Sequence, residues 1–449
     1  TIAAISSATG GAIAVIRVSG DNAFETCKAV WKSNELKCRE LITHGKMSLG
    51  KCEFGNDIPA EHAYAVFFRA PKTYTGEDIA EIYCHGGGLI AERILEALLK
   101  SGARQARPGE FTYRAFVNGK MDLSQAEAVA EIISAKTKLA LDLAEKQLDG
   151  ALSEALKPLL RKLEDILSDC EAELDFAEEH QIDSSTEIVE KTRSVAADIQ
   201  KIMLTANTGI LIRNGARIVI AGHPNAGKSS LFNLLLGKER AIVTSLPGTT
   251  RDTIEEDVMV GKIRATLIDT AGIRQAENII ENLGIQRSRK SIQSADIILW
   301  LLDPSGDHDA QIKEMKAHCS LKNGMAVWNK SDLLSEKESA ALPFAGFKGI
   351  VISVAKKRAI DKLKNALEES LGIRNAGADI EFAVNARHLN LLYEASNSIK
   401  KAEEDLQISQ TETASLFIRK TISAIRQIMG EEVAPDVLDS IFSKFCIGK

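Results

Sequence analysis

The chain has 449 residues, too many for one ordinary domain, and its length predicts about two to four domains. Apolar residues make up 45% and aromatic residues only 5%, a balance that favours aliphatic helix packing over an aromatic-rich β protein. The formal net charge of −6 excludes a chain that binds polyanions with its whole surface, although it leaves room for a local basic surface that contacts RNA.

Cysteine usage and hydropathy narrow the class of protein further. Seven cysteines are scattered along the chain without a C-x-x-C pair, which argues against a disulfide framework or a structural zinc site and favours a reducing, cytoplasmic setting. The strongest apolar run, ADIILWLLD at 295–303, has the length of a strand. We therefore expect no membrane segment, and no secretory signal is visible at Thr1.

The first 118 residues alternate short strands with helices. Strands are predicted at 11–20, 63–71 and 78–88, followed by a helix at 89–102 that Gly102 ends. From Asp122 the composition shifts to Ala, Leu, Glu and Lys. Helical spacing of apolar residues then predicts two long amphipathic helices, over 122–148 and 152–179.

Five short apolar runs between 216 and 372 predict buried parallel strands, each followed by a turn or helix. They lie at 216–222, 265–270, 296–303, 325–330 and 349–354. Helices return at 387–406 and 413–430. The helices before 216 and after 372 share a composition, and neither set looks self-sufficient. We predict an α/β domain inserted into a helical domain made from both flanks, with segments 1–118, 119–212, 213–372 and 373–449.

The stretch GHPNAGKSS at 222–230 follows a predicted strand and precedes a predicted helix, as a phosphate-binding loop requires. Its glycines let backbone N–H groups surround the β-phosphate. Lys228 reaches the β- and γ-phosphates, and the Ser229 hydroxyl ligates Mg²⁺. The remaining loop positions of the predicted GTP site are Asn225, Ala226, Gly227 and Ser230.

Three further segments follow in the order that GTP binding requires. DTAG at 269–272 places Asp269 beside the magnesium, NKSD at 329–332 supplies Asp332, and ISVA at 352–355 offers a backbone N–H to the guanine oxygen. The Asp332 carboxylate accepts two hydrogen bonds from guanine that adenine does not offer, so the pattern predicts GTP rather than ATP. The other residues assigned here are Thr270, Ala271, Gly272, Asn329, Lys330, Ser331, Ser353, Val354 and Ala355.

The segment LPGTTRDT at 246–253, between the phosphate loop and DTAG, supplies the second magnesium ligand, Thr250. The other GTP-site residues predicted in and just before it are Thr244, Ser245, Leu246, Pro247, Gly248 and Thr249. The position after DTAG, where Ras-like enzymes have a water-orienting glutamine, is Ile273. Hydrolysis must therefore draw on another polar group, Asn225 or Glu281, and for Glu281 the spacing alone favours a solvated helix charge.

Several long motifs resemble those of the MnmE (TrmE) family of tRNA-modifying GTPases, over essentially the whole chain. They are YTGEDIAEIYCHGG, ARPGEFTYRAFVNGKMDLSQAEAVAEII, GTTRD and the terminal FCIGK. The resemblance implies a homodimer in which an N-terminal α/β folate-binding and dimerisation domain and a discontinuous helical domain carry an inserted Ras-like P-loop GTPase domain. It also implies modification of position 5 of the tRNA wobble uridine, giving an aminomethyl or carboxymethylaminomethyl group. The implied partner is MnmG, which carries FAD.

The resemblance further implies how hydrolysis proceeds without the glutamine. Potassium takes the place of an arginine finger, and its implied ligands are Asn225, Thr244, Leu246 and Thr249. Glu281 becomes the water-organising residue, acting with Lys228 and Thr250. The guanine loop departs from the family's S-A-[KR], because it reads Ser353, Val354, Ala355, so the packing of a long basic side chain is lost.

The family also binds a one-carbon carrier, 5-formyl- or methylene-tetrahydrofolate. The matching positions are Arg17, Glu81, Lys120 and Lys449. A carboxylate can pair with the amidine-like edge of a pterin, and basic groups suit the folate glutamate tail. Without the resemblance, the residues alone would make Arg17, Glu81 and Lys120 structural surface charges.

The terminal FCIGK places Cys446 where a prenylation box has its lipid acceptor, but Gly448 and Lys449 do not fit such a box. The preceding helical stretch at 434–444 predicts an ordered terminus. The resemblance implies that this tail reaches the folate site. Cys446 is then either a residue that takes part in the chemistry or a small buried residue.

Three other classes of protein were weighed. A ribosome-assembly or other RNA-associated GTPase of the Era or Der type is the main alternative, but no KH-like GXXG segment follows 373 and only one phosphate loop is present. A lipid-anchored switch is opposed by Gly448 and Lys449, which do not fit a prenylation box. A helical scaffold with a vestigial GTPase is opposed by the intact Lys228, Ser229, Asp269 and Asp332.

Overall fold

The computed structural model describes residues 1–8, 10–33, 45–54, 59–175, 183–239, 255–269, 291–374, 380, 382 and 384–449. The chain divides into two compact units. Unit 1 contains residues 1–130, 147–167 and 418–449, and unit 2 contains residues 131–146 and 168–417.

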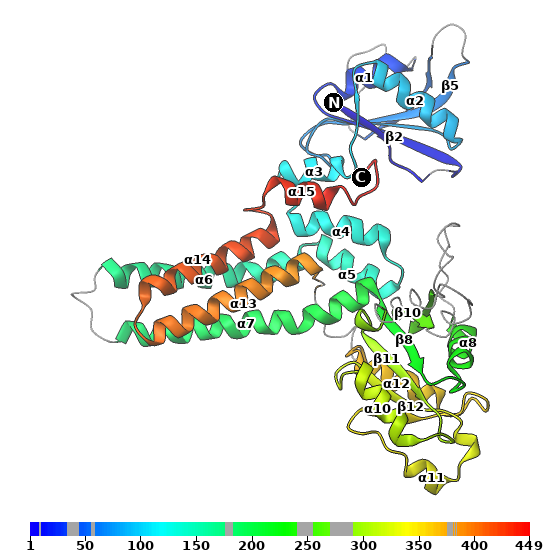
Figure 1. The fold of residues 1–449 in the computed structure, drawn as a ribbon. Helices are drawn as coiled ribbons and strands as arrows, with labels where there is room; N and C mark the ends of the chain where they lie inside the picture. The colour runs from blue at the N-terminus through cyan, green and yellow to red at the C-terminus, as the bar shows by residue number, and fades with distance from the viewer. Residues whose placement is uncertain are drawn as a thin grey trace, which may run out of the picture. The chain divides into compact units, whose positions relative to one another are not determined.

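Unit 1 is built on a seven-stranded sheet with the order β3-β4-β5-β6-β2-β1-β7. Neighbouring strands are antiparallel except β1 and β7, which are parallel. The strands are β1 Ile2–Ile5, β2 Ile13–Ser19, β3 Trp31–Lys32, β4 Met47–Cys52, β5 Glu61–Phe68, β6 Ile79–His85 and β7 Arg104–Gln105. The helices α1 Ala23–Val30 and α2 Gly88–Lys100 pack against this sheet (Figure 1).

Alternation along β2 decides which side chains meet the helices. Ile16 and Val18 are fully buried in the core that also contains Ile94 and Leu98 of α2. Because successive strand residues point to opposite faces, Arg17 lies on the face away from that core. Arg17 is paired in register with Glu81 of β6, so the sheet itself brings these two charges together.

A helical subdomain of unit 1 holds the C-terminal tail. Its members include α3 Glu110–Val117, α4 Leu123–Ser134 and α15 Pro435–Phe442. The backbone N–H of Phe111 donates to the Lys449 carbonyl at 3.1 Å. Gly448 has φ 93°, and a Cβ there would lie 2.3 Å from the Ile5 carbonyl oxygen, so only glycine permits this close approach. The prediction of an ordered tail is confirmed.

Unit 2 contains a six-stranded sheet with the order β13-β12-β11-β8-β10-β9. The five predicted strands are confirmed and pair in parallel: β8 Ala216–Gly222, β10 Ile263–Asp269, β11 Ile297–Leu302, β12 Gly324–Trp328 and β13 Lys348–Val351. The edge strand β9 Glu255–Val260 is antiparallel to β10 and was not predicted, because its start, EED, is acidic.

Helices cover both faces of this sheet. The helices α8 Lys228–Glu239 and α12 Ile360–Ser370 share one core with alternate residues of β8, and α10 His308–His318 shares the other. The short elements between them are the 3-10 turn η3 Ser331–Leu333 and α11 Glu336–Ala340. The parallel strands consequently end at one edge, where loops carry the GTP motifs.

The helices that flank the inserted sheet come from both sides of the sequence. They include α6 Ala151–Asp175, α7 Asp183–Asn214, α13 Ala386–Gln407 and α14 Thr411–Met429. An ion pair of 2.9 Å joins Arg193, near the start of α7, to Glu403, near the end of α13, so these two helices pack antiparallel (Figure 1). A helix from before the inserted sheet thus packs against one from after it, as a discontinuous helical domain requires, while the predicted segment bounds stay a prediction.

One helix prediction is wrong. Residues 122–148 form two helices, α4 and α5 Lys138–Leu148, instead of one. The break is at Thr137, whose hydroxyl accepts from the Ala140 N–H at 3.1 Å. A threonine that satisfies a backbone donor in this way starts a new helix instead of continuing the old one.

The N-terminus of α3, which binds the tail, is fixed by an ion-pair network around Glu110. Its carboxylate contacts Arg104 at 2.5 Å and Arg114 at 3.1 Å. Arg114 also contacts Glu77 at 2.8 Å. Burial alone would raise the pKa of Glu110, but hydrogen bonds from Arg104, the Arg107 backbone and Arg114 outweigh burial and lower this pKa from 4.5 to about 2.

We expect Glu110→Gln to remove part of the acid sensitivity of unit 1. A depressed carboxyl pKa contributes stability above pH 4.5 that is lost as pH falls towards about 2. The wild-type melting temperature should therefore fall more steeply over this interval than that of the variant. Exposed Glu92→Gln on α2 is the control, and identical pH profiles for wild type and Glu110→Gln would contradict the expectation.

Candidate functional site

The phosphate loop joins β8 to α8 at the carboxyl edge of the unit 2 sheet. Its backbone is left-handed at Asn225, with φ 61°. A Cβ on Gly227 would lie 2.3 Å from the Asn329 side-chain nitrogen, so a larger residue cannot occupy this position. The Lys228 ammonium donates to the carbonyls of Gly222 at 3.1 Å and His223 at 2.8 Å, which holds it over the loop that receives the phosphates.

Two of the residues predicted around the magnesium, Ser229 and Asp269, lie together. The Ser229 hydroxyl donates to the Asp269 carboxylate at 3.1 Å, and Asp269 is buried at the end of β10. A hydroxyl and a carboxylate are the oxygen ligands that Mg²⁺ prefers. The pair fits the ion: Ser229 would be the direct ligand and Asp269 would lie in the surrounding shell.

The guanine loop is tied to the phosphate loop by one buried amide. The Asn329 side chain donates to the Ala226 carbonyl at 2.8 Å and accepts from the Val354 N–H at 3.0 Å. The Ser353 hydroxyl donates to the Asp332 carboxylate and holds its pKa below its usual value. Asp332 is therefore an ionised, oriented acceptor, as selection of guanine requires.

Several predicted residues lie outside the part of the chain that the structure describes. They are Thr244, Ser245, Leu246, Pro247, Gly248, Thr249, Thr250, Thr270, Ala271, Gly272 and Glu281. Their assignments, including three of the four implied potassium ligands, stay predictions. Ser230, Lys330, Ser331 and Ala355 are described and lie on the same loops or the first turns after them.

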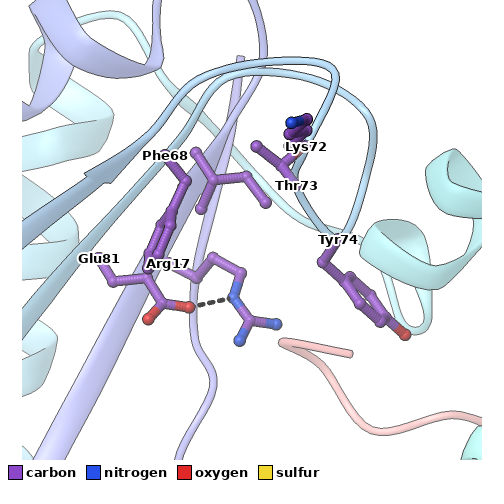
Figure 2. A pocket seen from close by; sticks show the side chains of 7 residues that line it. Arg17, Phe68, Lys72, Thr73, Tyr74 and Glu81 are labelled. Atoms are coloured by element: carbon purple, nitrogen blue, oxygen red, sulfur yellow. Dashed lines mark hydrogen bonds and ion pairs between the residues drawn. The ribbon is translucent and has the colours of Figure 1, made fainter. Parts of the chain in front are cut away.

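A cavity of about 400 Å³ opens on the unit 1 sheet, on the face of β2 and β6 that carries Arg17 and Glu81. Figure 2 shows these two residues together with Phe68, Lys72 and Tyr74 around it. Arg17 Nε donates to Glu81 Oε1 at 2.7 Å. The predicted pair thus lines a pocket, with Glu81 buried and Arg17 partly buried, so the two charges do not lie on an open surface.

Aromatic residues that the sequence analysis did not assign orient this pair. The Arg17 guanidinium lies 5.7 Å from the ring centres of both Tyr74 and Phe111, a cation–π arrangement that fixes its plane. The Tyr83 hydroxyl donates to Glu81 Oε2 at 2.6 Å. Burial, together with this bond, raises the pKa of Tyr83 to about 12. Its position two residues after Glu81 on one strand was the available signal.

The remaining predicted folate residues lie around the same region without lining the cavity. The Lys120 ammonium donates to the Pro71 carbonyl at 3.0 Å, which braces the loop that carries Lys72. The backbone carbonyl of Lys449 accepts from Phe111, the residue that stacks on Arg17. Cys446 is an exposed free thiol, so the alternative that it is a small buried residue is wrong.

Among the described residues, no cluster of three or more His, Cys, Asp or Glu side chains could hold a metal ion. In the same part of the chain, no helix combines the length and apolar character that a membrane crossing requires.

Comparisons with known proteins cover the full length. Residues 1–120 match the family model described as the GTP-binding protein TrmE N-terminus, and residues 123–446 match the MnmE helical domain model. The tRNA modification GTPase MnmE of Caldicellulosiruptor saccharolyticus is 40% identical over 456 residues, covering 100% of this chain and 99% of the relative. The MnmE of Thermotoga petrophila is 37% identical over 457 residues, covering 100% of both chains.

The chain belongs to the MnmE (TrmE) family. As an MnmE-family protein it is an enzyme that hydrolyses GTP to GDP and phosphate. Its N-terminal α/β domain, discontinuous helical domain and inserted P-loop GTPase domain confirm the predicted fold class. The Era or Der alternative is thereby set aside.

We expect the Asp332→Asn variant of this MnmE-family protein to prefer xanthine nucleotides over guanine nucleotides. An amide cannot accept both guanine hydrogen bonds, so affinity for GTP should fall about 100-fold. The same amide can donate to the 2-oxo group of xanthine, so affinity for XTP should rise. Titration with fluorescent GTP and XTP analogues measures both, and a variant that still prefers guanine would contradict the assignment of Asp332.

Proposed function

We propose that this protein acts in the cytoplasm with the FAD-carrying partner MnmG to modify position 5 of the tRNA wobble uridine. It uses a tetrahydrofolate one-carbon unit and potassium-dependent GTP hydrolysis, and the product is the aminomethyl or carboxymethylaminomethyl uridine. Membership of the MnmE family, and the name tRNA modification GTPase that its relatives carry, support the tRNA substrate.

The observation that carries the folate part is the oriented Arg17–Glu81 pair in the unit 1 cavity. One Glu81 oxygen receives Arg17 and the other receives Tyr83, which leaves further lone pairs for donors on a ligand. The amidine-like edge of a pterin supplies such donors in a plane. A cavity of about 400 Å³ also lies in the usual range for small-molecule sites, about 300–1,000 Å³.

The tail supplies groups near this pocket in the proposed function. Lys449 carries a cation suited to the folate glutamate tail, as does Lys120. Cys446 is exposed, so its thiol is accessible to a reacting partner. We assign Cys446 to the modification chemistry and not to GTP hydrolysis, because it lies in unit 1 and the GTP motifs lie in unit 2.

In the GTPase, Lys228 neutralises charge on the β- and γ-phosphates. Ser229 and Thr250 would hold magnesium, with Asp269 in the surrounding shell, and the ion would supply charge that polarises the γ-phosphate. Asn225 lies exposed on the phosphate loop and, with Thr244, Leu246 and Thr249, would hold potassium, whose charge offsets that developing on the phosphates. Glu281 orients the attacking water. GTPase domains of two protomers pair to complete this site.

The tRNA proposal is tested in a gene-deletion strain by mass spectrometry of wobble uridines. Loss of 5-substituted uridines is expected, with full recovery on complementation by the wild-type gene. Glu81→Gln should fail to restore the modification while the purified variant keeps its GTPase rate, because the two sites are separate. Exposed Glu53→Gln is the matched control, and unchanged uridines in the deletion strain would defeat the proposal.

Potassium dependence is tested by comparing GTP turnover in KCl and NaCl at equal ionic strength. We expect turnover in KCl at least tenfold faster, a difference of about 1.4 kcal/mol in the barrier. Equal ionic strength removes general screening as an explanation. Equal rates in the two salts would exclude the potassium site without affecting the tRNA proposal.

A further inference from the structure

Lys330, inside the guanine loop, is held by a carboxylate that lies outside every GTP motif. Its ammonium contacts Asp303 Oδ2 at 2.5 Å. Asp303 directly follows β11 and Lys330 follows Asn329 after β12, and these two strands are parallel neighbours. Asp303 and Lys330 are 27 residues apart in sequence, so the adjacency of β11 and β12 in the sheet brings them together.

Asp303 is itself fixed on every side. Its backbone N–H donates to Gln311 Oε1 and its carbonyl accepts from Gln311 Nε2, both at 2.8 Å. Gln311 is buried in α10. The other carboxylate oxygen, Oδ1, accepts from the Ser305 N–H at 3.0 Å and the Ser305 hydroxyl at 2.5 Å. Oδ2 is thus held toward Lys330.

Lys330 is unusual at the backbone as well as at the side chain. Its φ is 60°, a left-handed conformation that side chains rarely adopt and that often occurs at binding sites. A free lysine side chain loses rotamer freedom when a ligand orders it. The Asp303 ion pair orders the ammonium beforehand, so the aliphatic stem already lies in one place beside Asn329.

We propose that Asp303 is a positioning residue for nucleotide binding, which anchors Lys330 so that its stem forms a fixed apolar wall for the purine ring. The inference rests on the assignment of the 329–332 loop to guanine. The planar base then packs on methylene groups that are already ordered. Lys330 also keeps Asp303 ionised: burial would raise the pKa of Asp303, but the bonds from Lys330 and Ser305 outweigh burial and lower it.

The test is a double-mutant cycle on binding of fluorescent GDP to the full-length protein. Asp303→Asn should weaken binding about tenfold, as loss of a charge-assisted hydrogen bond does. Lys330→Met, which keeps the stem length and removes the charge, should weaken it similarly. The double variant should be no weaker than Lys330→Met alone, because both changes break the same pair.

Four further measurements separate positioning from a general structural effect. For Asp303→Asn, the loss of GDP affinity should appear as a faster GDP dissociation rate. Its KM for GTP should rise, while its kcat at saturating GTP should stay within twofold of wild type. Asp309→Asn, on an exposed residue in the first turn of α10, should leave binding unchanged and so exclude a long-range charge effect. Equal melting temperatures show that Asp303→Asn folds.

If Asp303→Asn folds, two outcomes would overturn the proposal. One is Asp303→Asn binding within twofold of wild type, and the other is a double variant whose loss is the product of the two single losses. If Asp303→Asn does not fold, Lys330→Met alone decides: unchanged GDP binding overturns the proposal, and a tenfold loss supports it. Failure of the guanine assignment itself is seen separately, as unchanged base preference in Asp332→Asn.

Discussion

The nucleotide site depends on one buried amide, that of Asn329. It donates to the Ala226 carbonyl and accepts from the Val354 N–H, so it joins the loops that follow three different strands. A buried amide must satisfy both its donor and its acceptor, and here each is satisfied by a different loop. The requirement extends to Gly227, where a side chain would occupy the space of the Asn329 nitrogen. Phosphate binding and base recognition are therefore parts of one hydrogen-bonded unit.

In unit 1 the charged group of the pocket, the Arg17 guanidinium, is held in place by neighbouring side chains without a ligand. Arg17 is paired with Glu81 and lies between Tyr74 and Phe111. Phe111 also donates its backbone N–H to Lys449. The C-terminal tail and the pocket arginine are thus linked through one residue of α3. One hydrogen bond therefore ties the last residue of the sequence to the helix whose Phe111 ring packs on the pocket arginine.

Sequence patterns were most informative where a motif and a strand coincide. The five parallel strands of unit 2 and the phosphate and guanine loops that follow them were predicted because apolar runs and motif spacing agree. The break at Thr137 was missed, because a threonine in an Ala- and Leu-rich stretch differs little from a helical residue until its hydroxyl finds the Ala140 N–H. Strand β9 was missed because its first three residues are acidic, so its sequence does not alternate between apolar and polar residues.

The sequence by itself determined the family and the inserted domain, and it predicted the residues of the GTP site, because these follow from local motifs and their order. Only the tertiary structure decided which distant residues share a site. Tyr83 on Glu81, Phe111 on Arg17 and Asp303 on Lys330 come from strand register and strand adjacency. Such contacts leave no local pattern, since a carboxylate that holds a lysine in place reads in sequence like any other surface charge.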